Sequence, residues 1–338
     1  MQKDVYDKYM ANKYVITNGC LEIYNDSELN SIDFINKFKV TQLSIEKCRK
    51  LIPKLNSLTI KELSLELCNV KNIEKIQTKN LEVLILAEDP KNKTQFNTED
   101  ICKFQKLKHL DISGYNNVNA NQIIILGLTI IKLSNCGIKN IDNIRQLVNL
   151  VELDLNTNQN IDVSPLSELK QLTNLDLGRC NIKNTYTIQK LENLDELLLY
   201  GNQDIDITPL QYLKKLKVLN LNACNLQNID MLQTLVYLQK LYISDNQIMY
   251  AFNLYKNSNS YHNYILKIIY QLIFKQQKNM LTSIVMFQMI NKNQPNNKYH
   301  LHSLAQNCSK VDDKKLYYFQ IKHRLIFRGS RLLYVINI

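Results

Sequence analysis

The sequence contains little glycine and proline and has no long apolar run. Seven Gly and five Pro in 338 residues, with 45% hydrophobic and 22% charged residues, exclude a collagen-like, linker-dominated or wholly disordered chain. The N-terminal residues, MQKDVYDKYMANKYVITNG, lack the apolar core and the small-residue cleavage site of a secretory signal, so we expect a cytoplasmic protein. The most apolar stretch, 264–290, is interrupted by Lys267 and by KQQKN, so we expect no transmembrane span.

Sequence motifs for catalysis and for metal or cofactor binding are also missing. Eight cysteines occur, but no CxxC pair is formed. The chain has no GxSxG, P-loop, HExxH or kinase-type motif. We therefore expect a protein that is not an enzyme and that uses no cofactor, no metal and no small-molecule substrate.

Positive charge is concentrated near the C-terminus. Residues 251–338 contain 13 Lys and Arg against two Asp, which accounts for the whole net charge of +11, whereas residues 1–250 contain 29 basic and 29 acidic residues. An argument from basicity for nucleic acid or anionic lipid therefore concerns only the C-terminal segment.

A 22-residue repeat organises the rest of the chain. The first apolar residue of the pattern LxxLxL recurs every 22 residues, at Leu128, Leu150, Leu172, Leu194, Leu216 and Leu238. The same frame fits degenerate copies upstream, at Leu107, Leu81, Ile60 and Val40, with a weaker copy around Leu21. A fixed period of this length predicts a solenoid of stacked repeats, and about ten can be counted.

Three segments carry a family resemblance: LTNLDLGRCNIKN, LVELDLNTNQNIDVSPL and LDELLLYGNQDIDITPL resemble leucine-rich repeat proteins of the 22-residue type, as in the phosphatase-regulator and internalin-like subfamilies. DVSPL at 162–166 and DITPL at 206–210 resemble the internalin-type linker between strand and convex side. The resemblance covers about 20–250 and implies an α/β-type repeat solenoid, a leucine-rich repeat horseshoe with a parallel concave β-sheet and short 3₁₀ or extended convex segments. Family members act as scaffolds, enzyme regulators or adhesins, which implies a protein-interaction scaffold or regulatory subunit here.

The ninth position of the repeat alternates between two residue types, in the order Cys136, Asn158, Cys180, Asn202, Cys224 and Asn246. Cys48 and Cys68 occupy the same position further upstream. At this position the chain leaves the strand, and the side chain must satisfy buried backbone groups, which Asn does well and a thiol does weakly. We therefore expect these cysteines to be reduced thiols in a core ladder, and not metal ligands.

The residues between the leucines predict a binding surface. In LxxLxL the leucines face the core and the intervening residues face the concave sheet, because side chains alternate along a strand. An acidic patch beside an exposed apolar and aromatic pair is expected at the centre, and the candidate partner-binding residues are Glu152, Asp154, Asp176, Glu196, Leu198, Tyr200 and Tyr242. We predict that this surface binds a basic or amphipathic segment of a protein partner. The alternative is a solvated polar face whose charges only keep the sheet soluble, with Leu198 and Tyr200 packing on neighbouring strands.

Other chemistries fit the acidic patch poorly. Calcium needs six to eight converging oxygen ligands, whereas these carboxylates stand side by side on a sheet. A glycosidase pair needs a deep cleft and an acid with a raised pKa, and the pattern supplies no covering element. His109 falls on an exposed column and has no nucleophile beside it, so we expect a surface histidine.

The sequence divides the chain into an N-terminal cap segment at 1–19, a repeat solenoid at 20–250 and a basic C-terminal segment at 251–338. Apolar spacing predicts a capping helix over 262–290, which would cover the last repeat. Three interpretations of the basic segment stay open. It folds back onto the acidic patch, it is poorly ordered, or it contacts nucleic acid or an anionic membrane through Lys314, Lys315, Lys322, Arg324, Arg328 and Arg331.

Overall fold

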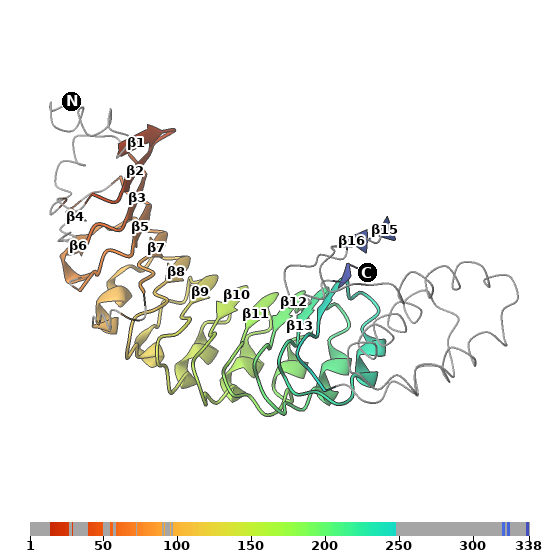
Figure 1. Ribbon diagram of the computed structural model, residues 1–338. Helices are drawn as coiled ribbons and strands as arrows, with labels where there is room; N and C mark the ends of the chain where they lie inside the picture. Colours follow the sequence, from red (N-terminus) through yellow and green to blue (C-terminus); the bar gives the residue numbers. More distant parts are fainter. Residues whose placement is uncertain are drawn as a thin grey trace, which may run out of the picture.

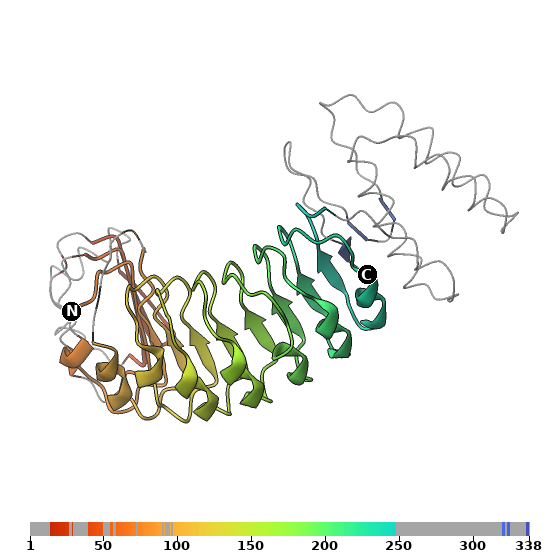
Figure 2. The ribbon, with the colours of Figure 1, turned by 90° about the horizontal axis from the view of Figure 1, so that it is seen from below.

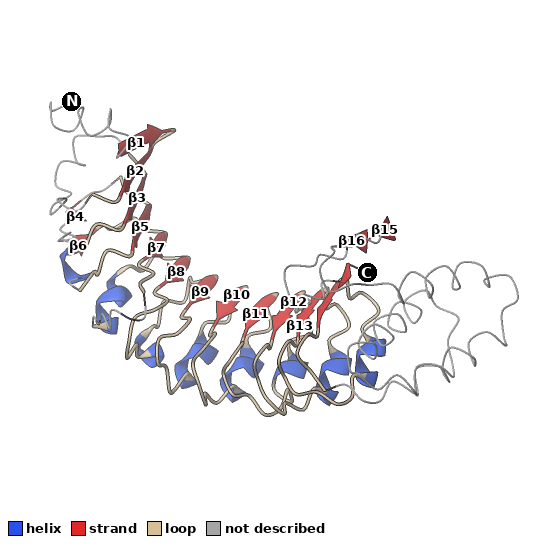
Figure 3. Ribbon diagram, viewed as in Figure 1, coloured by secondary structure: helices blue, strands red, loops and turns tan. Residues whose placement is uncertain are grey.

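The computed structural model describes residues 14–26, 29, 40–49, 55–56, 59–71, 73–89, 91, 95, 97–247, 320–321, 323–324 and 336–337. The described residues between 14 and 247 form a curved solenoid (Figure 1). Strands line its inner, concave side and short helical turns lie on its outer, convex side (Figure 3). A single continuous cluster of buried apolar side chains runs between these two layers from Leu21 to Ile243.

The concave layer is a sheet with eleven parallel strands. In spatial order they are β2 (Cys20–Tyr24), β3 (Gln42–Glu46), β5 (Glu62–Glu66), β7 (Val83–Ile85), β8 (His109–Asp111), β9 (Ile130–Lys132), β10 (Glu152–Asp154), β11 (Asn174–Asp176), β12 (Glu196–Leu198), β13 (Val218–Asn220) and β14 (Lys240–Tyr242). An antiparallel strand closes each end of this sheet, β1 (Tyr14–Thr17) beside β2 and β17 (Ile336–Asn337) beside β14. Two further pairs are described, β4 (Leu55–Asn56) with β6 (Ile76–Gln77) and β15 (Gln320–Ile321) with β16 (His323–Arg324).

The convex layer consists of 3₁₀ helices, which Figure 2 shows in a row along the outer side. They are η2 (Ile73–Lys75), η4 (Thr98–Lys103), η5 (Ala120–Gln122), η6 (Asp142–Gln146), η7 (Ser164–Glu168), η8 (Ile188–Lys190), η9 (Thr208–Tyr212) and η10 (Asp230–Thr234). Asp162 Oδ1 accepts a hydrogen bond from the N–H of Ser164 at 2.9 Å and so begins η7, and Asp206 does the same for η9. These turns confirm the short convex segments that the repeat length predicts.

The strand register confirms the predicted separation of core and concave positions. Leu153 pairs with Leu175 and Leu175 pairs with Leu197, and each leucine is at most 1% exposed. The residues on either side of Leu175 point the other way and are only partly buried. A slip of one residue would exchange these two faces, so the leucines fix the register by their burial.

Asn side chains at the ninth position join neighbouring repeats. Oδ1 of Asn202 accepts from the backbone N–H groups of Cys180 and Ile182, at 3.1 and 2.9 Å. Its Nδ2 donates to the carbonyls of Leu177 and Leu199, at 2.9 and 2.7 Å. Equivalent sets of four bonds recur at Asn158 and Asn246. These amides satisfy backbone groups that lie out of reach of water.

Cys side chains at the same position make fewer and weaker bonds. The thiol of Cys180 donates to the carbonyl of Leu155 at 3.1 Å, and Cys136 and Cys224 bond the preceding repeat in the same way. Burial raises the pKa of Cys68, Cys136 and Cys180 to about 12, so these thiols stay protonated. All five ladder cysteines are buried and reduced, which confirms the predicted core ladder.

Some predicted features lie outside the described residues. These are residues 1–13 of the cap segment, the helix over 262–290 and the basic side chains after residue 247. The boundaries at 20 and 250 stay predictions.

No helix in the described part of the chain has the length and apolar character that a membrane crossing requires.

Candidate interaction site on the concave sheet

An open hollow of about 300 Å³ lies at the centre of the concave sheet, over β10, β11 and β12. We call it the central acidic hollow, and its lining residues are Lys132, Glu152, Leu153, Asp154, Asn174, Leu175, Asp176, Glu196 and Leu198. Five of the seven predicted site residues line it, namely Glu152, Asp154, Asp176, Glu196 and Leu198. Tyr200 and Tyr242 do not.

Parallel pairing in register places these side chains in two rows across the strands. One row contains Glu152, Asn174 and Glu196, and the other contains Asp154, Asp176 and Leu198. Adjacent strands are about 4.8 Å apart, so each side chain in a row can touch the next. The two rows bring four carboxylates from three strands to one surface.

Asp154 and Asp176 are tied to the backbone. Oδ1 of Asp154 accepts from the N–H of Asn156 at 2.8 Å, and Oδ1 of Asp176 accepts from the N–H of Gly178 at 2.8 Å. Burial raises the pKa of Asp154 to about 6; the Asn156 hydrogen bond offsets part of this shift and the charge of Asp176 adds to it. Burial also raises the pKa of Asp176. These two carboxylates therefore form a partly desolvated floor that a cation would stabilise in its ionised form.

Glu152 and Glu196 form opposite sides of the hollow. Nζ of Lys132 lies 3.1 Å from Oε1 of Glu152, so one of the four carboxylates has an ionic partner on the neighbouring strand. Glu196 has no ion pair with another described residue, and it stands next to the apolar side chain of Leu198. The side of the hollow formed by β12 therefore combines negative charge with apolar surface.

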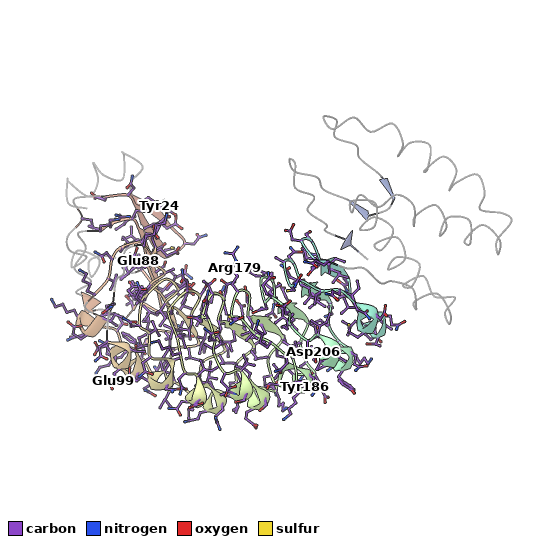
Figure 4. All side chains as sticks on the ribbon, turned by 60° about the horizontal axis from the view of Figure 1, so that its bottom comes forward. Tyr24, Glu88, Glu99, Arg179, Tyr186 and Asp206 are labelled. Atoms are coloured by element: carbon purple, nitrogen blue, oxygen red, sulfur yellow. The ribbon has the colours of Figure 1, made fainter. Side chains whose placement is uncertain are left out.

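Tyr200 differs from the exposed aromatic side chain that the sequence predicts. Its side chain is half-buried and reaches across two strands, where Nδ2 of Asn156 donates to its hydroxyl. The ring passes over Gly178, where any Cβ would collide with the ring. The Arg179 guanidinium lies over the ring at 5.9 Å from its centroid. Tyr200 thus packs over the ends of the neighbouring strands and is not a free binding residue. The exposed side chain at this place is Arg179, which lies on the concave side in Figure 4.

Tyr242 occupies the strand position that the repeat predicts, whereas His109 differs from expectation. Tyr242 pairs with Asn220 on β13, which in turn pairs with Leu198, so Tyr242 lies two strands away from the edge of the hollow. His109 is half-buried and not a surface histidine, because the neighbouring strands cover it. Its Nε2 is buried without a hydrogen-bond partner among the described residues, and burial lowers its pKa, so it is neutral at pH 7.

The sequence-based site omits Lys132, Asn156 and Arg179. The register places Lys132 opposite Asp154, and its side chain reaches diagonally to Glu152, with Nζ 3.1 Å from Oε1. The contact of Asn156 with Tyr200 joins residues 44 positions apart, and its only sequence signal is the glycine at 178 between them.

No group of three or more His, Cys, Asp or Glu side chains within the described ranges could hold a metal ion.

No protein-family model and no curated protein sequence matches this chain. Several solved structures match this chain. A leucine-rich repeat protein of Leptospira interrogans is 24% identical with a TM-score of 0.52, over 73% of this chain and 65% of that protein. PEPR1, in a structure with AtPEP1, is 17% identical with a TM-score of 0.50, over 65% of this chain and 37% of that one.

An internalin (inlF) of Listeria monocytogenes is 19% identical with a TM-score of 0.48, over 74% of this chain and 64% of that one. The chain therefore spans less than two-thirds of the length of each of these three proteins. The likeness to the Leptospira protein and to PEPR1 concerns the fold, and it agrees with the parallel sheet and the 3₁₀ turns described above. The chain folds as a leucine-rich repeat solenoid.

Proposed function

We propose that this chain is a non-enzymatic interaction protein that binds a basic or amphipathic segment of a protein partner in the central acidic hollow. The observation that carries the proposal is the set of four carboxylates that the register places in one open hollow, with Lys132 as the single cation in its lining. The fold alone does not choose a partner, because leucine-rich repeat solenoids serve unrelated binding functions.

Electrostatics favour a cationic ligand. Two like charges about 5 Å apart repel by roughly 1 kcal/mol in water and by more where the surface is desolvated. The pKa of Asp154 is raised to about 6, chiefly by burial, and the charge of Asp176 adds a smaller contribution. A Lys or Arg side chain placed between Asp154 and Asp176 would relieve the repulsion without competing for the backbone N–H groups that the same carboxylates accept.

The apolar side of the hollow favours an amphipathic segment over a free cation. Leu198 lines the hollow and stays partly exposed, next to Glu196. A segment with apolar residues beside its basic ones would bury Leu198, at about 25 cal/mol per Å² of apolar surface removed from water. Charge would then steer the partner, and apolar contact would hold it.

A non-enzymatic role is supported by the same geometry. The hollow is open, and three of its four carboxylates are already engaged, Asp154 and Asp176 with backbone N–H groups and Glu152 with Lys132. His109, the histidine within the described repeats, is not part of its lining.

The test is affinity capture from cell lysate with the full-length chain as bait, followed by identification of the retained proteins. Glu152→Lys/Glu196→Lys reverses two charges in the hollow and leaves Asp154 and Asp176 in place. Glu168→Lys/Glu192→Lys makes the same change in net charge at exposed positions outside the concave sheet and serves as the control. We expect a partner that the hollow variant loses and the control keeps. Equal retention by both variants would contradict the proposal.

The alternative function, nucleic-acid or anionic-membrane binding through the basic C-terminal segment, rests on side chains outside the described residues. In the capture experiment it predicts ligands that both variants retain and that dissociate steeply with added salt.

A further inference from the structure

A second acidic surface lies at the N-terminal end of the same concave sheet. We call it the N-terminal acidic patch, and it consists of Glu22 on β2, Glu46 on β3, and Glu62 and Glu66 on β5. Glu46 pairs in register with Glu66 on one side and with Tyr24 on the other. Glu62 is exposed and the other three glutamates are partly exposed, so all four present charge to the concave space.

The contacts within this patch leave it strongly negative. Tyr24, which is 40% exposed, donates its hydroxyl to Glu22 at 2.9 Å, and Ser64 donates to Glu66 at 2.9 Å. Lys47 Nζ lies 2.6 Å from Glu46 Oε1, and this is the one ion pair that the four glutamates form with another described residue. The hydrogen bond to Glu22 raises the pKa of Tyr24, and burial and the negative charges of Glu22 and Glu46 add to the shift.

Between the two acidic surfaces the concave sheet is nearly uncharged and partly apolar. Val83 and Ile85 on β7 and Ile130 on β9 are half-buried and face the concave side. Asp111 pairs in register with Lys132, whose ion pair is with Glu152 of the hollow, so Asp111 is the one acidic side chain of β7 to β9 on this face. His109, held neutral by burial, adds no charge here.

The spacing of the two surfaces sets the length of a ligand that reaches both. Six strand intervals separate β3, at the centre of the patch, from β11, at the centre of the hollow. At about 4.8 Å per interval this is about 29 Å along the sheet. An extended segment covers that distance with about nine residues, at about 3.3 Å per residue.

We infer that the partner carries two basic clusters separated by an apolar stretch, and that it lies along the concave sheet with one cluster on the N-terminal acidic patch and the other in the central acidic hollow. The inference rests on the proposed function and specifies the chemistry and length of the partner. Charge complementarity indicates that the two ends of the partner segment are basic. The side chains of Val83, Ile85 and Ile130 indicate that its middle is apolar. Neither surface alone would give the affinity of the pair, because the second contact is intramolecular once the first has formed.

The test measures binding of fluorescent synthetic peptides to the full-length chain by anisotropy. One peptide has a single cluster of four Lys and Arg residues; two others have two such clusters joined by apolar spacers of either two or twelve residues. The twelve-residue spacer is long enough to connect the N-terminal acidic patch with the central acidic hollow, and the two-residue spacer is not. We expect the long two-cluster peptide to bind at least about tenfold more tightly than the short one.

Three variants assign the effect. Glu46→Lys/Glu66→Lys should abolish the gain from the long spacer and leave single-cluster binding to the hollow intact. Glu152→Lys/Glu196→Lys should weaken single-cluster binding as well, and Glu168→Lys/Glu192→Lys should change neither. Thermal unfolding verifies that each variant is folded. If Glu46→Lys/Glu66→Lys does not fold, Glu46→Gln/Glu66→Gln takes its place.

The outcomes distinguish a failure of the two-cluster partner from a failure of the proposed function, which is binding in the central acidic hollow. If the long spacer brings no gain, or if the N-terminal variants keep the gain, a single site binds and the two-cluster partner is wrong while the proposed function stands. If the hollow variant binds the single cluster as well as the unaltered chain does, the proposed function itself is wrong. Concentration-dependent self-association that both reversals abolish would identify a second copy of this basic-tailed chain as the occupant and would overturn the inference.

Discussion

The central repeats, residues 128–247, and the N-terminal repeats, residues 40–89, share one strand register but hold their strand ends differently. In the central repeats buried Asn158 and Asn202 each bond two N–H groups and two carbonyls across neighbouring repeats. In the N-terminal repeats this position holds Cys48 and Cys68, whose thiols donate to carbonyls at 3.2–3.5 Å. The buried carboxylate of Glu88 accepts from the N–H of Asn69 at 2.6 Å there.

The concave faces differ in the same way. Asp154 and Asp176 accept backbone N–H groups, are partly desolvated and have raised pKa values. Among the described residues, Glu22, Glu46 and Glu66 of the N-terminal acidic patch contact the side chains of Tyr24, Lys47 and Ser64, respectively. The comparison teaches that the central repeats combine a charged surface with a rigid frame, whereas the N-terminal repeats present charge on longer, freer side chains.

The largest expected effect concerns what the two regions have in common. Leu175→Ala in the central repeats and Leu63→Ala in the N-terminal repeats should each lower the free energy of unfolding by about 2–5 kcal/mol, because both leucines are essentially fully buried. Urea unfolding measures the change. Asn174→Ala, next to Leu175 but on the concave side, should stay within about 0.5 kcal/mol. A cost at Asn174 as large as at Leu175 would mean that the register is wrong.

The second effect concerns the ladder and should separate the two regions. Asn202→Ala leaves two buried N–H groups and two carbonyls short of a partner, and it should cost about 3 kcal/mol. Cys68→Ala removes only weak thiol contacts and should cost about 1 kcal/mol. The same unfolding measurement compares them. Similar costs at the two positions would remove the proposed difference in rigidity.

The smallest effect concerns charge and pH. Because the pKa of Asp154 is raised from 3.8 to about 6, the folded protein holds a proton that the unfolded chain has lost, so stability falls as pH rises between about 4 and 6. Asp154→Asn should remove this penalty and stabilise the protein at pH 7 by about 1–2 kcal/mol. Asn fits because Asn220, in the same column, accepts the N–H of Asn222 at 3.1 Å.

Unfolding at pH 4.5 and pH 7 tests this prediction. Glu66→Gln in the N-terminal acidic patch is the matched control, because it also neutralises one carboxylate on the concave face, and it should not stabilise the protein at pH 7 as Asp154→Asn does. A destabilised Asp154→Asn protein at pH 7 would show that the carboxylate is favourable as it stands.

Sequence alone predicted the repeated part of this structure. The 22-residue period fixed which residues share a strand position, and alternation along each strand then placed Glu152, Asp154, Asp176 and Glu196 on one surface. The alternation of Cys and Asn likewise predicted the ladder, because one chemical demand, a buried strand end, recurs in every repeat.

Features that depend on side-chain packing between repeats were not predicted. Tyr200 turns toward Asn156 because Gly178 leaves room for its ring, and no local pattern encodes that direction. His109 has an exposed position in the repeat, yet its neighbours bury it. The sequence does not predict the N-terminal acidic patch, because its repeats are degenerate. The strand register reveals it by pairing Tyr24 with Glu46 and Glu46 with Glu66.

The measurement that tests the central claim most directly is carbodiimide cross-linking of a bound lysine-rich peptide to the full-length chain, mapped by mass spectrometry. The reaction joins an amine only to a carboxylate that it contacts. Our account predicts cross-links at Glu152, Asp154, Asp176 and Glu196, which line the central acidic hollow. Cross-links that follow exposure alone, with Glu168 and Glu192 labelled as strongly as these four, would contradict it.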